Sequence, residues 1–275
     1  KALGYYNRAL EIYQRINEKK DAVEALQLIA IIFRKQRNYD QSLQKLTSAL
    51  QISNSNGFMS TKAHIYSSLG TIYNLQSNNK KGLEVLQKAL DINKSLNDRF
   101  LECHILGDLG GVYANMGQYQ NACKTYKDTI KITTEIRDKK LEGIYIGNLG
   151  DVYFNLNRLD EASEHLIQAI DICDKLVPPA AGAFMGSLAL VYAKNSNIDD
   201  ALELVKRGEP LVAVYPLEYG KFLCKKAMVQ HLGNKSDEAQ NTLSKADDIA
   251  KELNLGKDSE LKRECSEARE LLSEN

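Results

Sequence analysis

The sequence predicts an all-α superhelical solenoid of about six helix–turn–helix repeats, followed by a C-terminal capping helix. Two observations lead to this prediction. A short motif containing an aromatic residue recurs about every 40 residues, and a pair of small residues seven positions apart follows each copy. A repeat of this length cannot bury its apolar face alone, so successive repeats stack on one another. Residues 1–275 are therefore expected to form a single array.

The first helix of each repeat is predicted from the recurring motif. Its shared position is aromatic in five copies and polar in a sixth, degraded one: Phe33, Tyr73, Tyr113, Tyr153, Tyr192 and Gln230. The successive spacings are 40, 40, 40, 39 and 38 residues. Apolar residues at helical spacing precede the aromatic, as in Ile65, Leu69 and Ile72. Such a stripe is typical of an amphipathic helix with one buried face.

The second helix of each repeat is predicted from small residues, because two helices approach closely only where side chains are small. The first small position is occupied by Ser42, Gly82, Ala122, Ala162, Ala201 and Ala239. The second is occupied by Ala49, Ala89, Thr129, Ala169, Gly208 and Ala246. Turn-prone residues such as Gln76-Ser77-Asn78-Asn79 separate the two helices.

These patterns set the expected boundaries. The repeats are expected at about 20–58, 59–98, 99–138, 139–177, 178–216 and 217–255. Residues 1–18 are expected to be the second helix of a partial repeat, and residues 257–274 a capping helix with apolar positions at Leu261, Cys265 and Ala268. Pro178, Pro210 and Pro216 are expected to mark repeat boundaries, because proline ends helices.

Composition excludes several function classes. Lys plus Arg and Asp plus Glu are both 36, which argues against a nucleic-acid or membrane-surface partner. No apolar run is long enough to span a bilayer, and no signal peptide is evident, so we expect a cytoplasmic protein. The five cysteines form no Cys-x-x-Cys pair, which indicates packed, reduced thiols and no metal site. No catalytic or phosphate-binding motif occurs, so neither an enzyme nor a cofactor is expected.

The motif Leu-Gly-x-x-Tyr, present at Leu69 to Tyr73 and again at Leu149 to Tyr153, resembles the tetratricopeptide repeat when combined with two small residues seven apart. The resemblance extends from Ala2 to about Leu253. The period of 40 exceeds the usual 34, and the proline that closes the second helix is absent. This longer form is similar to the repeats of LGN/Pins adaptors, kinesin light chains and bacterial signalling proteins. The resemblance implies a right-handed superhelix that binds a protein or peptide.

The resemblance also implies that the first helices line a concave binding face. Its exposed positions lie at −9, −6, −5, −2, +1 and +2 from the aromatic. The candidate peptide-binding residues at these positions are His64, Ser67, Ser68, Thr71, Asn74, His104, Asp108, Gly111, Asn115, Asn148, Asp151 and Asn155. A merely solvated polar helix face is the alternative interpretation. His64 and His104 share a position, but no third ligand accompanies them, so a metal pair is disfavoured.

Two further expectations concern this face. The glycines at 107, 111 and 147 are expected to leave room for a ligand, because glycine inside a helix otherwise costs stability. Asp108 and Asp151 are expected to make the centre acidic, between basic ends. The basic ends comprise Arg34, Lys35, Lys221 and Lys225. A partner with a basic middle would fit this arrangement.

Three functions remain open on the sequence alone. The first is a protein- or peptide-binding adaptor. The second is a regulatory or sensor module of a larger bacterial kinase, cyclase or ATPase regulator, with an intramolecular contact to a further domain. The absence of an initiator Met favours a fragment and hence this reading. The third is a self-association scaffold, which light scattering on dilution would test. A HEAT-like array has a similar period but lacks the Leu-Gly-x-x-Tyr motif.

Overall fold

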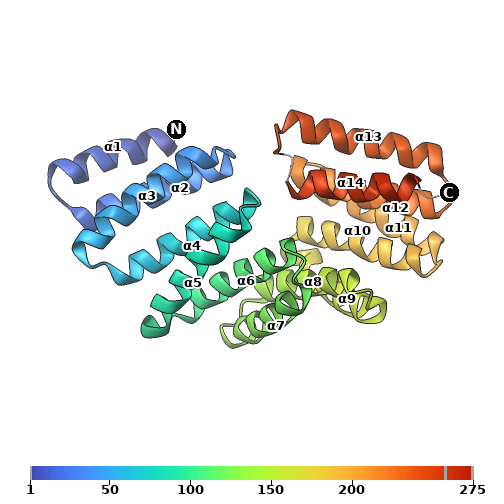
Figure 1. The fold of residues 1–275 in the computed structure, drawn as a ribbon, viewed down its shortest axis with the longest axis horizontal. Helices are drawn as coiled ribbons and strands as arrows, with labels where there is room; N and C mark the ends of the chain where they lie inside the picture. Colours follow the sequence, from blue (N-terminus) through green and yellow to red (C-terminus); the bar gives the residue numbers. More distant parts are fainter. Residues whose placement is uncertain (1, 257–258, 274–275) are drawn as a thin grey trace. The chain divides into compact units, whose positions relative to one another are not determined.

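The computed structural model describes residues 2–256 and 259–273. Within those ranges it contains fourteen α-helices and no strand (Figure 1), which confirms the predicted all-α architecture of helix–turn–helix repeats. The helices are α1 (Ala2–Arg15), α2 (Lys19–Lys35), α3 (Tyr39–Asn56), α4 (Met59–Leu75), α5 (Asn79–Leu96), α6 (Arg99–Asn115), α7 (Tyr119–Glu135), α8 (Lys139–Asn155), α9 (Leu159–Leu176), α10 (Pro178–Lys194), α11 (Ile198–Val212), α12 (Pro216–Leu232), α13 (Ser236–Glu252) and α14 (Glu260–Ser273).

The chain divides into two compact units, Lys1–Val112 and Tyr113–Asn275, called here the N-terminal and C-terminal units. In the N-terminal unit, α1 packs on α2, α2 on α3, α3 on α4 and α4 on α5. In the C-terminal unit, consecutive helices from α7 to α14 pack on one another, and α12 also contacts α10 and α14. Within the described ranges, none of the helices combines the length and apolar character needed to cross a bilayer.

The turn inside each repeat has a left-handed residue at its centre. These residues, with φ between 55° and 71°, are Arg37, Ser77, Gly117, Asn157, Ser196 and Asn234. The next backbone N–H donates back to the carbonyl of the motif aromatic, as Asn78 does to Tyr73 at 2.8 Å. This six-to-one bond closes the helix end in the Schellman manner. The constant spacing between the motif position and the second helix therefore reflects one repeated turn geometry.

Small residues lie at the crossings of first and second helices, as predicted. The side chains of Ser42, Ala49, Ala89, Ala122, Thr129, Ala162, Ala169, Ala201, Ala239 and Ala246 are all buried. In the fourth repeat, a Cβ atom added to Gly150 would lie 2.8 Å from Cγ of Leu166 in α9. Contacts this close are not seen between real side chains, so the α8–α9 crossing requires glycine at that point.

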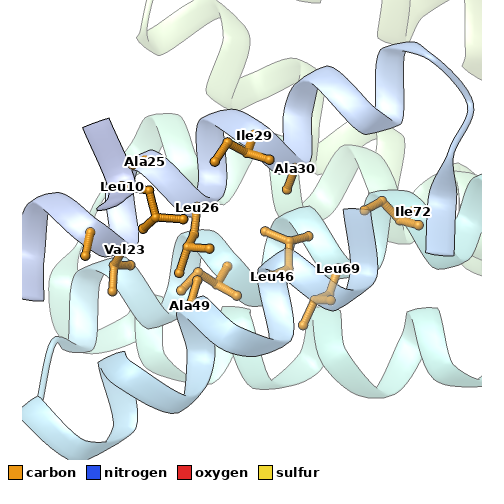
Figure 2. Packing of buried hydrophobic residues seen from close by; sticks show 12 residues of the cluster. Leu10, Val23, Ala25, Leu26, Ile29, Ala30, Leu46, Ala49, Leu69 and Ile72 are labelled. Carbon is orange, nitrogen blue, oxygen red and sulfur yellow. The ribbon is translucent and has the colours of Figure 1, made fainter. Parts of the chain in front are cut away.

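The core of the N-terminal unit is a continuous apolar cluster shared by neighbouring helices (Figure 2). Leu26 and Ile29 of α2 meet Leu46 of α3, and Leu69 and Ile72 of α4 continue the cluster. Fully burying an aliphatic side chain of this size contributes about 1.5–3 kcal/mol. Because each cluster draws side chains from more than one repeat, stacking supplies most of the stability of each helix.

Polar residues lie where the second helix of one repeat ends and the first helix of the next repeat begins. Asn97 and Arg137 adopt left-handed conformations, with φ of 52° and 58°. The following Asp98 and Asp138 cap the next helix: Oδ1 of Asp98 accepts from the backbone N–H of Leu101 at 2.9 Å, and Oδ1 of Asp138 accepts two N–H groups at 3.0 Å. An aspartate at this position satisfies donors that the first helical turn leaves unpaired.

Proline behaves as predicted at two of three boundaries. Pro178 and Pro216 are the first residues of α10 and α12, where a missing N–H costs nothing. Pro210 instead lies inside α11, two residues before its end at Val212, so it does not mark a boundary. It occupies the last turn of the shorter, 15-residue second helix of the fifth repeat.

The capping helix is α14. The expected range of 257–274 includes residues 257, 258 and 274, which lie outside the described residues. Leu261, Cys265 and Ala268 are buried against α12 and α13, as predicted from their spacing. All five cysteines of the chain are free thiols with buried side chains.

Candidate functional site

The twelve candidate residues belong to first helices and are distributed over both compact units. Those on α4 and on α6 as far as Gly111 belong to the N-terminal unit, whereas Asn115, Asn148, Asp151 and Asn155 belong to the C-terminal unit. Each unit therefore has its own first-helix face. We define it in the N-terminal unit by Arg34, Thr71 and Asp108, and in the C-terminal unit by Asp151, Ser187, Lys221 and Lys225.

In the N-terminal unit the structure brings Thr71 and Asp108 together. The Thr71 hydroxyl of α4 donates to Oδ2 of Asp108 in α6 at 2.5 Å, and its oxygen also lies 3.2 Å from the Ser67 carbonyl. Burial raises the pKa of Asp108 to about 6, although the Thr71 hydrogen bond and the positive charge of Arg34 favour the ionised form. A carboxyl group with this pKa changes charge near neutral pH.

The remaining candidates of this unit differ in exposure. His64 is exposed, and the Ser67 side chain is buried, so a partner could reach only the first of these directly. His104 is half-buried, with its ring edge-on to Phe100 at 5.1 Å between centroids. The half-buried candidates that complete the set are Ser68, Asn74 and Gly111.

In the C-terminal unit two candidate amides are engaged with the protein itself. Asn155 is exposed, and its Nδ2 donates to the backbone carbonyl of Asp151 one turn earlier at 2.9 Å. Asn115 accepts two hydrogen bonds from Arg263 of α14, one at its carbonyl oxygen (2.9 Å) and one at Oδ1 (3.1 Å). Asn148 is half-buried in α8. Arg263 is thus a site residue that the sequence did not indicate.

Asp151 interacts electrostatically with residues of α12 and α14. Nζ of Lys225 donates to Oγ of Ser187 in α10 at 2.7 Å. Burial lowers the pKa of the Lys225 ammonium group. The negative charges of Asp151 and Glu264 have the larger effect, so this pKa is above its usual value. Burial also raises the pKa of Glu264 to about 8, and this shift is opposed by Lys225. Acidic and basic groups are therefore interleaved on this face.

Lys221 lies one helical turn before Lys225. Its Nζ forms ion pairs with Glu218 at 3.1 Å and with Glu260 of α14 at 3.0 Å. Burial lowers the pKa of Lys221, but Glu260 and Glu218 together outweigh that effect and raise it above its usual value. The Lys221–Glu260 pair joins the last repeat to the capping helix.

These contacts correct two sequence expectations. The acidic centre and basic ends are not separated, because Asp151 acts electrostatically on Lys225 and Arg34 acts on Asp108. Gly147 does not leave room for a ligand, because a Cβ atom there would clash with the ring of Phe184 in α10. Its small size serves the packing of α8 against α10.

Ser187 could have been found from the sequence. It lies five residues before Tyr192, the position that Asp108 occupies before Tyr113 and Lys225 before Gln230. In contrast, Glu260, Arg263 and Glu264 lie in α14, which carries no copy of the motif. Their positions relative to the face could not be read from repeat spacing.

The repeat spacing and the turns agree with the comparison to known families. A family model described as the MalT-like TPR region matches residues 59–246. The chain belongs to the MalT-like TPR family. A second model, described as a tetratricopeptide repeat, matches residues 25–59. No curated protein sequence matches this MalT-like TPR region.

Solved structures with the same fold share little sequence with this MalT-like TPR chain. Apo RapI is 18% identical, with a TM-score of 0.68, over 92% of this chain and 99% of that one. A Rap protein in complex with Competence and Sporulation Factor is 15% identical, with a TM-score of 0.69, over 92% and 76%. A signal transduction ATPase with numerous domains and a tetratricopeptide repeat sensor, from Pyrococcus horikoshii, is 18% identical, with a TM-score of 0.66, over 96% and 41%. At sequence identities this low, the structural similarity shows a shared fold only.

Proposed function

We propose that the chain is a protein- or peptide-binding scaffold and that the first-helix faces carry its binding residues. The observation behind this proposal is that polar side chains from successive first helices meet on one side of each unit. Thr71 reaches Asp108 across α4 and α6, and Ser187 reaches Lys225 across α10 and α12. Polar groups held by a rigid helical array can recognise an extended or helical segment through hydrogen bonds and charge.

The similar structures support the same proposal. One Rap structure contains Competence and Sporulation Factor, and a Rap conjugation gene regulator contains a Phr* peptide. Tetratricopeptide repeats are typically non-catalytic scaffolds, and we assign no catalytic step to this chain. The five buried free thiols are in keeping with a reducing, cytoplasmic setting.

A sensor module is the second candidate. The multidomain ATPase from Pyrococcus horikoshii aligns with 96% of this chain over only 41% of its own length, and its repeats are described as a sensor. In such a role the first-helix faces would bind a signal or another domain of the same protein. The full-length reading frame distinguishes this role from that of a free adaptor.

Affinity capture tests the proposed function. The bait is the wild-type chain, the Asn148→Ala/Asp151→Ala variant, or a control variant, Glu164→Ala/Asp171→Ala, altered on exposed positions of the adjacent α9. We expect a partner that is recovered with the wild type and the control but is lost with the α8 variant. Equal recovery by all three folded chains would contradict a first-helix binding face.

A further inference from the structure

The capping helix presents two different faces to the C-terminal unit. Leu261 and Cys265 are buried against α12 and α13, so they attach the helix to the last repeat. Glu260, Arg263 and Glu264 follow the i, i+3, i+4 spacing of a single helix face. This polar face extends to Lys221 in α12 and to Asn115 at the end of α6.

Lys221 of α12 is more deeply buried than the Glu260 carboxylate that pairs with it. Only 17% of the Lys221 side chain is exposed, against 49% of the Glu260 side chain. Glu260 can therefore turn into solvent, while the ammonium group of Lys221 stays in place beside Glu218. The pair is held by attraction that salt screens, and such partly exposed pairs exchange easily.

Lys225 donates to a hydroxyl group, while two buried polar atoms of α14 lack hydrogen-bond partners within the described part of the chain. Its Nζ donates to the neutral hydroxyl of Ser187, although Glu264 lies near enough to act on its charge. Among the described residues, Oε2 of Glu264 and Nε of Arg263 are buried and take part in no hydrogen bond. Buried polar atoms without partners cost stability, so this arrangement is not optimised as a closed structural network.

We propose that Lys221 and Lys225 form a recognition site for the carboxylates of an acidic peptide segment, and that Glu260 and Glu264 of α14 occupy this site as built-in competitors. The inference rests on the proposed function and adds the chemistry of the partner. A segment with two carboxylates about one helical turn apart would replace the glutamates one for one. A tethered competitor has an effective concentration in the millimolar range, so a free peptide competes only when it also makes contacts elsewhere.

The surrounding charges favour a peptide over a nucleic acid. Glu218 and Asp151 flank the two lysines and remain when the glutamates of α14 turn away. A continuous chain of phosphates would meet these carboxylates, whereas a peptide can place a neutral or basic residue beside them. Ser187 supplies a hydroxyl that can donate to a carboxylate once Lys225 has turned toward the ligand.

Fluorescence anisotropy with a labelled hexaglutamate peptide tests the inference on the full chain. The titration is made at pH 9, above the pKa of Glu264, so that both glutamates are ionised in the wild type and become neutral isosteres in the variant Glu260→Gln/Glu264→Gln. We expect this variant to bind the peptide at least tenfold more tightly than the wild type, and a labelled hexaglutamine peptide to bind neither. The matched control is Glu267→Gln/Glu270→Gln, which removes the same charge from exposed positions of the same helix and leaves the affinity at the wild-type value.

Adding Lys221→Gln/Lys225→Gln to the Glu260→Gln/Glu264→Gln variant tests whether the two lysines bind the peptide. The tenfold gain is expected to disappear. A gain that survives loss of the lysines, a gain that the control variant shares, or no gain at all would overturn the inference. Competition by free glutarate at the same concentration as the peptide would reassign the site to a small dicarboxylic acid and would also overturn it. If the double variant loses helicity, Glu264→Gln alone carries the same test.

Failure of this inference can be distinguished from failure of the proposed function. If affinity capture finds a partner that depends on Asn148 and Asp151, the scaffold function stands whatever the hexaglutamate titration gives. If the Asn148→Ala/Asp151→Ala variant recovers as much partner as the wild type but hexaglutamate binds through the lysines, the carboxylate site at Lys221 and Lys225 stands. The proposed location of partner binding then fails.

Discussion

The hydroxyl of Thr71 and the carboxylate of Asp108 link two consecutive first helices through a hydrogen bond of 2.5 Å. Asp108 lies five residues before its motif aromatic, and Thr71 lies two residues before its own. Positions −2 and −5 of adjacent repeats are therefore neighbours on the first-helix face. The bond favours the ionised carboxylate, and burial opposes it.

Asp108 should make the stability of the chain depend on pH. Its pKa is raised from 3.8 to about 6 in the folded chain, so the folded state holds the proton more tightly than the unfolded one. The stability from this group is present below about pH 4 and is lost as the pH rises toward about 6, by an amount on the order of 2 kcal/mol. Asp108→Asn should remove that loss. Urea unfolding of both chains across this window measures the difference, and parallel pH profiles would rule it out.

Gly150→Leu should disrupt the α8–α9 crossing. A Cβ atom added at this position would lie 2.8 Å from Cγ of Leu166, so a larger side chain forces the helices apart at a cost of about 3 kcal/mol. Gly4→Leu is the matched control, because nothing lies within 4 Å of a Cβ atom at that position. Thermal melts followed by circular dichroism compare the two. An unchanged melt for Gly150→Leu would show that the assigned crossing is wrong.

The turn geometry predicts opposite effects of two substitutions. Ser77 has a φ of 55°, a conformation that strains any residue with a Cβ atom. Ser77→Gly should therefore stabilise the chain by about 0.5–1 kcal/mol. Gly117 has a φ of 71° with open space around it, so Gly117→Ala should cost about 1 kcal/mol through strain alone. Denaturant midpoints test both changes, and shifts of the same sign would contradict the shared geometry.

Arg263 should hold α14 against the C-terminal unit. Cys224 and Cys265 lie 3.4 Å apart between their sulfur atoms, buried between α12 and α14. They react with a thiol reagent only when this contact opens. Arg263→Ala removes the bonds to Asn115, so dithionitrobenzoate should label these two thiols several-fold faster. Cys173, buried in α9, serves as the internal control. Equal labelling rates in both chains would show that Arg263 does not restrain the helix.

The constant repeat spacing explains how much of the fold could be predicted. Ala162 and Ala169 are buried at a helix crossing because a period of about 40 residues places them there in every repeat. The left-handed conformation of the turn residues was harder to predict from the sequence, since only Gly117 among the six is a glycine. Gly147 was misinterpreted because a missing side chain can make room for a ligand or for a neighbour, and Phe184 fills the space.

The site was harder to predict than the fold. Asp151 was assigned to the acidic centre and Lys225 to a basic end because they lie far apart in sequence. The stacked first helices nevertheless bring them close enough for Asp151 to raise the pKa of Lys225. The bonds from Arg263 to Asn115 join residues 148 positions apart. Such a contact depends on how α14 docks, and no repeat motif specifies that.

Isothermal titration calorimetry with the captured partner tests the central claim most directly. The wild type, Asn148→Ala/Asp151→Ala and the α9 control are titrated under one condition, after circular dichroism has shown equal helicity. A binding face on the first helices predicts at least a tenfold loss of affinity in the α8 variant, about 1.4 kcal/mol, and no loss in the control. Equal affinities for all three chains would contradict the claim and would move the binding site away from the first-helix face.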